Sequence, residues 1–138
     1  MKRNLLLVLS IFVITIASAT EAPKVVQENF AKKFPAAKSV KWEKEGSKEY
    51  EASFVLDDLK CSANFRIDGT WLETEIEIKA SELPAAVASA IKVKYAKWKI
   101  IGAAKMETSK GEIKYEADLK IGKKEKEVQL NVTGIFVK

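Results

Sequence analysis

The chain has 138 residues and a formal net charge of +5, and 31% of its residues are charged, with lysines and glutamates interspersed along its length. This mixture is typical of a solvated protein surface and excludes the concentrated basic patch of a nucleic-acid-binding protein. The chain contains no histidine, which excludes the commonest general base and the serine–histidine and cysteine–histidine catalytic pairs. Its single cysteine, Cys61, excludes an internal disulfide.

Residues 1–19 have the pattern of a secretory signal peptide. A basic start is followed by an apolar run over residues 5–16 and by the small residues Ala17-Ser18-Ala19, so we expect cleavage between Ala19 and Thr20. The alternative is a retained N-terminal anchor, but the apolar run is shorter than the roughly 20 residues of a transmembrane helix. We therefore predict an exported protein of the bacterial periplasm or cell surface, whose mature chain has no membrane span.

A helix and four strands are predicted for the first half of the mature chain. Val26, Phe30 and Phe34 recur at a four-residue spacing, which indicates an amphipathic helix. This helix is expected to end at Phe34-Pro35, because a proline pushes the preceding residue out of the α region. The alternation of apolar and polar residues then predicts strands over residues 39–43, 49–56, 59–67 and 71–78.

Two turn motifs predict the register of these strands. A two-residue loop at Asp57-Asp58 pairs Phe54 with Cys61 and Glu49 with Arg66. A second two-residue loop at Asp68-Gly69, a sequence typical of a type I′ turn, predicts three further pairs: Cys61 with Ile76, Phe65 with Leu72, and Arg66 with Trp71. Apolar residues then oppose apolar ones and acid opposes base, as expected for a correct register.

The pattern returns about 65 residues later. Residues 50–54 correspond to 115–119, and residues 65–71 correspond to 130–136. We predict an α+β fold in which residues 20–138 form a single domain of two repeats, about 20–79 and 80–138. Each repeat is a helix followed by three or four antiparallel strands, and the helices pack on one face of an antiparallel sheet. The repeated register puts Leu119 opposite Lys126, which indicates either a frayed strand end or a loop longer than two residues at Gly122-Lys123-Lys124, and we favour the longer loop.

Several short motifs follow one another in an order typical of one family. They are Phe34-Pro35, Val40-Lys41-Trp42, residues 50–54, Asp68-Gly69-Thr70-Trp71, Glu73-Thr74-Glu75, and Leu83-Pro84 with Val87. Together they resemble the secreted PepSY-like domains, which are similar to β-lactamase-inhibitor proteins. The second repeat departs from the pattern, since it has no proline after Tyr95 and has Met106 in place of tryptophan. The resemblance implies tandem α–β repeats; related inhibitors bind an enzyme with the concave sheet face, and PepSY-type domains are proposed to restrain peptidases.

The candidate binding surface is the outer face of the first repeat. Five residues are predicted there: Trp71, Arg66, Glu73, Glu75 and Glu49. Trp71 beside Arg66 would form a cation–π pair typical of an interaction hot spot, whereas in the alternative a loop or strand covers Trp71. Glu73, Glu75 and Glu77 line one side of a strand, either as a salt-bridged surface or as a site for a cation or for acid–base chemistry.

These observations predict a non-enzymatic binding module of the cell envelope. Its sheet face binds a protein, peptide or small ligand, and the resemblance implies a peptidase or another enzyme as the target. No catalytic residue, metal ligand or cofactor is predicted, and Cys61 is expected to be a buried core residue rather than a reactive thiol. The alternatives are a cation-binding or acid–base enzymatic module that uses Glu73, Glu75 and Glu77, and a purely structural role in a surface assembly.

Overall fold

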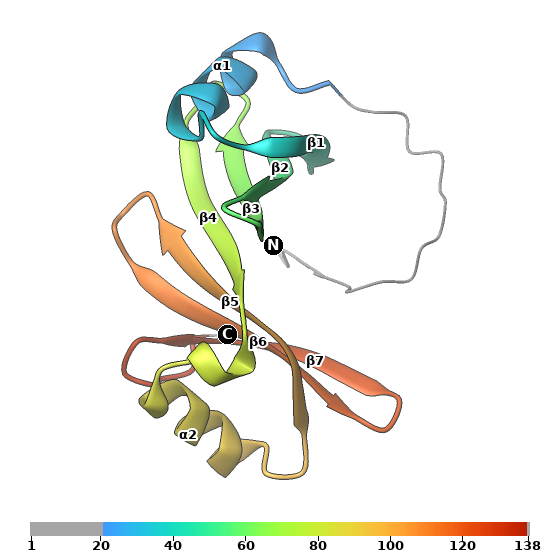
Figure 1. Cartoon of the computed structure of the whole chain (residues 1–138), viewed down its shortest axis with the longest axis vertical. Helices are drawn as coiled ribbons and strands as arrows, with labels where there is room; N and C mark the ends of the chain where they lie inside the picture. The colour runs from blue at the N-terminus through green and yellow to red at the C-terminus, as the bar shows by residue number, and fades with distance from the viewer. Residues whose placement is uncertain (1–20, 138) are drawn as a thin grey trace.

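The computed structural model describes residues 21–137, so the predicted signal peptide and its cleavage site at Ala19 and Thr20 lie outside the described residues. Within them, two α-helices and a 3₁₀ turn accompany one antiparallel sheet of seven strands, an α+β arrangement. The helices are α1 (Lys24–Lys33) and α2 (Ala85–Lys94), and the 3₁₀ turn is η1 (Ala80–Glu82). The strands, in their order across the sheet, are β1 (Lys38–Glu45), β2 (Glu49–Leu56), β3 (Leu59–Arg66), β4 (Trp71–Ile78), β5 (Lys99–Thr108), β6 (Ile113–Ile121) and β7 (Lys124–Asn131). Figure 1 shows α1 and α2 at opposite ends of the molecule.

Both helices begin after a proline and end at an aromatic residue. Pro23 and Pro84 precede them, where the missing N–H costs nothing because the first N–H groups of a helix have no partner within it. Phe34 and Tyr95 make the last helical backbone hydrogen bonds. The end of α1 at Lys33 confirms the break predicted before Pro35.

Each helix covers its own hydrophobic core. In the first core, the Phe30 ring of α1 lies 5.0 Å from the ring of Phe54 and 6.1 Å from that of Phe65, measured between centroids. In the second core, Val87 and Ile91 of α2 are buried against inward residues of β5, β6 and β7: Ala103, Ala117, Leu119, Val128 and Leu130. The aromatic contacts of Phe30 in the first core stabilise the fold by roughly 0.5–1.5 kcal/mol each beyond the burial of apolar area.

The hairpin of β2 and β3 has the predicted register. The two aspartates of its turn have φ angles of 51° and 63°, the left-handed values of a type I′ turn. Phe54 pairs with Cys61, and Glu49 pairs with Arg66. The two-residue loop predicted from the sequence is therefore confirmed.

The turn between β3 and β4 differs from the prediction. The N–H of Arg66 donates to the carbonyl of Thr70 at 2.8 Å, so three residues rather than two form the loop. Phe65 consequently pairs with Trp71 and not with Leu72, and the predicted pair of Arg66 and Trp71 is wrong. Leu72 is the extra residue of a β-bulge, which restores the predicted register further along these strands, where Cys61 pairs with Ile76.

The turn between β6 and β7 is shorter than predicted. Ile121 pairs with Lys124, so two residues form the loop, and the expectation of a longer one is wrong. Leu119 does oppose Lys126, yet Leu119 is fully buried in the second core. The mismatch is tolerated because the Lys126 ammonium extends to 5.3 Å from the centroid of the Tyr95 ring, where its charge stays in contact with solvent.

The turn between β3 and β4 has a counterpart after β7. The N–H of Gly69 donates to Arg66 at 2.9 Å, and the N–H of Gly134 donates to Asn131 at 3.0 Å. Both glycines have positive φ and lie against a helix. A Cβ atom on Gly69 would lie 3.0 Å from the Val25 side chain, and one on Gly134 would lie 2.5 Å from the carbonyl oxygen of Ala86. A larger residue at Gly134 would displace the backbone of α2, and one at Gly69 would displace side chains of α1.

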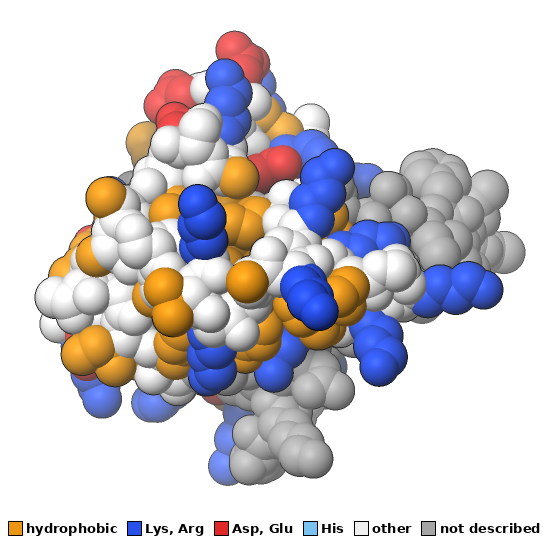
Figure 2. All heavy atoms as spheres, turned by 90° about the horizontal axis from the view of Figure 1, so that it is seen from below, with side chains coloured by type: hydrophobic (Ala, Val, Ile, Leu, Met, Phe, Trp, Pro, Cys, Tyr) orange, Lys and Arg blue, Asp and Glu red, His pale blue; other side chains and the backbone are white. Residues whose placement is uncertain are grey.

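The end of the molecule near α2 has an apolar and basic surface. Figure 2, which views this end, shows apolar side chains interspersed with basic ones. Val93 of α2 is 85% exposed, and Val132, Ile135 and Val137 of the C-terminal segment are also exposed. This surface differs in chemistry from the acidic face described below.

Candidate functional site

Acidic residues of β2, β4 and β6 point away from the core residues of their own strands. In β2 and β6 the alanine of each Tyr-Glu-Ala motif faces a core, so the neighbouring Glu51 and Glu116 lie on the opposite side. Glu75 of β4 lies on the same side, paired with Ser62 of β3 and Met106 of β5. We call the side of the sheet defined by these five residues the carboxylate face.

A cavity of about 350 Å³ opens on the carboxylate face. Its floor is formed by buried residues of β3, β4, β5 and β6, among them Ser62, Glu75, Ala104 and Glu116. Its rim is formed by exposed residues of β1 to β4, among them Lys41, Ser53, Lys60 and Glu77. The cavity is therefore open to solvent above and acidic below.

Glu75 is the residue of the floor whose carboxyl group is buried without a hydrogen-bond partner among the described residues. It is only 3% exposed, and neither of its carboxylate oxygens has a hydrogen-bond partner among residues 21–137. Burial, reinforced by the nearby carboxylates of Glu116, Glu73, Glu51 and Glu127, raises the pKa of Glu75 to about 9. Glu75 is thus a neutral carboxylic acid at neutral pH, because ionisation there would leave a buried and uncompensated charge.

Strands β6 and β7 bring three more carboxyl groups together. Oxygens of Glu116, Asp118 and Glu127 lie within 4.8 Å of one another, so the three residues could hold a cation. Glu116 is 2% exposed and accepts a hydrogen bond of 2.9 Å from Nε2 of Gln129. Burial raises the pKa of Asp118 to about 6, with contributions from Glu127 and Glu125.

Gly102 permits the close approach of Asp118 to β5. The pairing of β5 with β6 is irregular between Ile100 and Gly102, and Gly102 pairs with Asp118. A Cβ atom at Gly102 would lie 2.7 Å from Oδ2 of Asp118. Any larger residue would therefore displace the carboxyl group from its place at the edge of the cavity.

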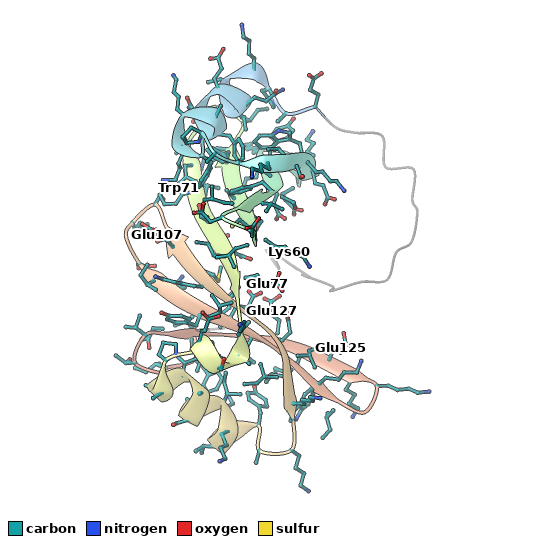
Figure 3. The ribbon with its side chains drawn as sticks, viewed as in Figure 1. Lys60, Trp71, Glu77, Glu107, Glu125 and Glu127 are labelled. Atoms are coloured by element: carbon teal, nitrogen blue, oxygen red, sulfur yellow. The ribbon has the colours of Figure 1, made fainter. Side chains whose placement is uncertain are left out.

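Lys60 and Glu77 form an ion pair at the rim. The Nζ atom of Lys60 lies 3.9 Å from Oε2 of Glu77, and both side chains are largely exposed. Figure 3 shows Lys60, Glu77 and Glu127 near the middle of the molecule, whereas Trp71 lies nearer to α1. An exposed pair of this kind contributes about 0–1 kcal/mol, so either partner can change its contacts at little cost.

The sequence matches the model of the beta-lactamase-inhibitor-like, PepSY-like family over residues 14–62 and 48–138. The chain belongs to this PepSY-like family. A search of curated proteins found no match to it. No stretch of helix within residues 21–137 of the PepSY-like chain has the length and hydropathy needed to cross a membrane.

Solved structures share the fold of this PepSY-like chain. A DUF2874 family protein from Bacteroides ovatus is 22% identical, with 86% of each chain covered and a TM-score of 0.76. A "putative periplasmic" protein from Bacteroides eggerthii is 18% identical, with 86% of this chain and 87% of that chain covered and a TM-score of 0.79. A BLIP-like protein from Bacteroides fragilis is 23% identical, with 86% and 84% covered and a TM-score of 0.70. At these identities the likeness establishes the fold.

Four of the five predicted binding residues lie on the carboxylate face of the PepSY-like chain. Glu49 and Arg66 pair with each other, Glu73 pairs with Asn64, and Glu75 is in the floor of the cavity. The stripe of Glu73, Glu75 and Glu77 follows one strand, but the carboxyl groups that converge are those of β6 and β7. This arrangement does not favour the alternative function based on the stripe.

Trp71 lies on the other side of the sheet. Its ring packs against the first core, and its Nε1–H donates to Oγ1 of Thr74 at 2.9 Å. The cation over the ring, 3.5 Å from its centroid, is Lys33 of α1 rather than Arg66. The ring is half-buried beside α1, so its neighbour is a helix rather than Arg66 or the loop or strand of the alternative.

Cys61 is buried in the first core, as expected. Burial raises the pKa of its thiol above the ordinary value. A thiol with a raised pKa forms little of the nucleophilic thiolate at neutral pH. The structure therefore gives Cys61 the character of a packing residue.

Sequence reasoning missed Glu116, Asp118, Glu127 and Gly102. One signal was available, because Glu116 occupies the place in its Tyr-Glu-Ala motif that Glu51 occupies in the first. The proximity of these residues to Glu75 depends on how β4 pairs with β5, across the segment that contains α2. No local pattern in the sequence specifies that pairing.

Proposed function

We propose that the chain is an exported, non-enzymatic binding module of the bacterial cell envelope that holds a protein or peptide against its carboxylate face. The observation that carries this proposal is the open cavity on that face, with the unpartnered carboxyl group of Glu75 in its floor. Partly apolar cavities with a few convergent polar groups are the usual form of a binding site. The inhibitor-like description of the family favours restraint of an envelope enzyme, such as a peptidase, as the form that binding takes.

We also propose that the sheet consists of two repeats with both helices on one side. Ile76 packs against the first core and Ile78 against the second, and residues two apart in a strand face the same side. The matching turns at Gly69 and Gly134 support the repeat. With both helices on one side, the carboxylate face remains free along the whole sheet, as docking of a protein requires. On this face Glu49, Arg66, Glu73 and Glu75 remain the proposed contacts from the first repeat.

Site-specific photo-cross-linking in living cells tests the proposed surface. A photoreactive residue placed at Ser53, on the rim of the cavity, is expected to cross-link one envelope protein, which mass spectrometry then identifies. The matched control is the same photoreactive residue at Val93, which is 85% exposed on α2. Direct binding of the identified protein, measured with purified components, should weaken with Arg66→Glu and remain unchanged with Lys33→Glu.

Two results would contradict the proposal. One is a partner that cross-links from Val93 and not from Ser53, which would move the interface to the α2 end. The other is a purified partner whose affinity is lowered equally by Arg66→Glu and Lys33→Glu, which would indicate a general effect of charge.

A further inference from the structure

We propose that the cavity on the carboxylate face receives the side chain of a lysine or arginine of the partner. The inference rests on the proposed function, because it assumes that a protein docks on this face. It adds the chemistry of the contact: an aliphatic stem in the cavity and a cationic head at its floor.

The floor offers several oxygen acceptors to a cation that donates hydrogen bonds, and such a cation can replace the proton that Glu75 otherwise holds. Glu75 offers two buried oxygens with no partner among the described residues, and Glu116 and Asp118 line the same cavity. Glu127 adds a third carboxyl group to the cluster of β6 and β7. An ammonium group has three N–H donors and a guanidinium group has five, and hydrogen bonds between such groups and carboxylates are among the strongest in proteins.

The walls match an aliphatic stem. Phe54 and Val55 line the cavity from β2, and Ala103 lines it from β5. Lysine and arginine place their methylene groups along apolar surfaces while the charged head reaches a polar environment. The apolar wall can therefore contact the methylene groups, and the acidic floor can contact the charged head.

The size of the cavity favours an organic cation over a metal ion. A volume of about 350 Å³ corresponds to roughly ten water molecules at ~30 Å³ each, far more than a single ion fills. Calcium also takes about six to eight oxygen ligands. If Glu116, Asp118 and Glu127, the three carboxyl groups that converge, each bound through one oxygen, at least half of those ligands would have to come from other groups. A lysine or arginine side chain fills more of the cavity than a metal ion does and also brings a positive charge to the carboxyl groups of its floor.

The two lysines that line the cavity do not contact the carboxyl oxygens of Glu75. The Nζ atom of Lys60 lies at the rim, 3.9 Å from Oε2 of Glu77, and Lys41 is exposed on β1. The oxygens of Glu75 remain without a partner although both lysines line the same cavity. A cationic side chain from outside can reach the floor through the open rim.

Titration of the isotope-labelled, purified protein with small probes, followed by NMR, tests the inference. The probes are the Nα-acetyl methylamides of lysine, arginine and norleucine, together with free cadaverine. We expect the lysine or arginine probe to shift the amide signals of Ser62, Glu75 and Ala104, and the norleucine probe to bind at least about tenfold more weakly, as the loss of a charge-assisted hydrogen bond predicts.

Three variants sharpen the test. Glu75→Gln removes the carboxyl group that can exchange its proton for the cation of the probe, and Ser53→Leu narrows the rim at an exposed position without changing charge. Each variant is expected to lower probe affinity by about tenfold. Glu107→Gln, an exposed substitution on β5, is expected to leave it unchanged. Because Ser53 is exposed, Ser53→Leu should fold even if Glu75→Gln does not.

Several outcomes would overturn the inference. One is a norleucine probe that binds as tightly as the lysine and arginine probes, and another is an affinity for these probes that neither Glu75→Gln nor Ser53→Leu changes. Saturation of the signals by cadaverine alone would assign the cavity to a free amine, and shifts with Ca²⁺ alone would assign it to a metal ion. A partner that cross-links from Ser53 while no amino-acid probe binds overturns only the inference and leaves the proposed function standing. Probe binding without any cross-linked partner contradicts the proposed function and, with it, the assignment to a partner's side chain.

Discussion

At the scale of single residues, the Glu75 carboxyl group lies among other carboxyl groups and can avoid a buried charge only by binding a proton or a cation. The charged groups that face it are Glu73 from its own strand and Glu51, Glu116 and Glu127 from β2, β6 and β7, while Ser62 and Met106 are its neutral neighbours. In the folded protein it keeps its proton up to a pH near its pKa of about 9, whereas its ordinary pKa is 4.5.

This raised pKa predicts that the protein loses stability as pH rises. The stabilising effect of the bound proton is fully present below about pH 4.5, decreases between about pH 4.5 and 9, and is lost above that range, because the unfolded chain releases the proton first. Glu75→Gln keeps the shape of the protonated acid and abolishes its titration. Relative to its value near pH 5, the free energy of unfolding of the variant should exceed that of the wild type by about 1–4 kcal/mol near pH 8.

Urea denaturation at the two pH values measures this difference. Glu107→Gln removes a glutamate that is exposed on β5, so it should leave the pH dependence of the wild type unchanged. The same decrease in stability from pH 5 to 8 in Glu75→Gln and in the wild type would show that another group is responsible.

At the scale of the elements, the turns decide which side of the sheet a residue faces. Asp57-Asp58 and Asp68-Gly69 both resemble type I′ turns, but only the first forms a two-residue loop. The second docks on α1, where Nδ2 of Asn29 donates to the carbonyl of Gly69 at 3.0 Å. The loop of three residues occurs together with this tertiary contact, so its length could not be predicted from the turn propensity of Asp68-Gly69 alone.

The extent to which the structure could be predicted follows from this distinction. The helix stripe of Val26 and Phe30, the end of α1 and the register of β2 with β3 depend on contacts near in sequence, and each was predicted. The position of Trp71 depends on a turn that packs against a helix. The floor of the acidic cavity depends on strands from both halves of the chain, and of its acidic residues only Glu75 was predicted.

Trp71 should therefore contribute to stability rather than to partner binding. Its ring covers the first core beneath Lys33, so Trp71→Ala is expected to lower the free energy of unfolding by about 2–4 kcal/mol through lost packing. Lys33→Ala removes only the exposed cation and should cost less than about 1 kcal/mol. Urea denaturation gives both values, and cross-linking from Ser53 should persist in each folded variant. Loss of that cross-link in folded Trp71→Ala protein would show that Trp71 does contribute to partner binding.

The packing of the Gly69 turn against α1 predicts that alanine lowers the free energy of unfolding more at Gly69 than at Gly46. Gly46 and Gly69 have φ angles of 64° and 88°, so alanine at either position pays for a left-handed backbone, roughly 1–2 kcal/mol. A Cβ atom at Gly46 meets nothing within 4 Å, whereas at Gly69 it would lie 2.6 Å from Nδ2 of Asn29. Gly69→Ala should thus cost at least about 1 kcal/mol more than Gly46→Ala in a denaturation experiment. Equal losses would mean that the turn moves away from α1 without cost.

At the scale of the whole molecule, the acidic cavity joins the two halves of the chain. Glu75 comes from β4 and Glu116 from β6, and the pairing of β4 with β5 holds them together. A site of this kind exists only when both halves are folded and paired.

A double-mutant cycle measures this coupling. The Glu116 carboxylate helps to raise the pKa of Glu75, so Glu116→Gln lowers the cost of keeping a proton on Glu75 near pH 8, and Glu75→Gln abolishes that cost. The two effects on the free energy of unfolding should therefore differ from additivity by about 0.5–3 kcal/mol. The pair of Glu75→Gln with Glu107→Gln is the additive control. Additivity in the first pair would show that the two carboxyl groups do not interact.

The order of the strands also has a consequence for folding. Every strand of the sheet pairs with its neighbour in the chain, and short turns join all the pairs except β4 and β5, which are separated by η1 and α2. Closing a longer loop costs more chain entropy, and pairs distant in sequence form more slowly. We expect pulse-labelled hydrogen exchange to find the amides between β4 and β5 protected last. The hairpins of each half then exist before the acidic cavity does, and the repulsion among its carboxyl groups arises only in the final step of folding.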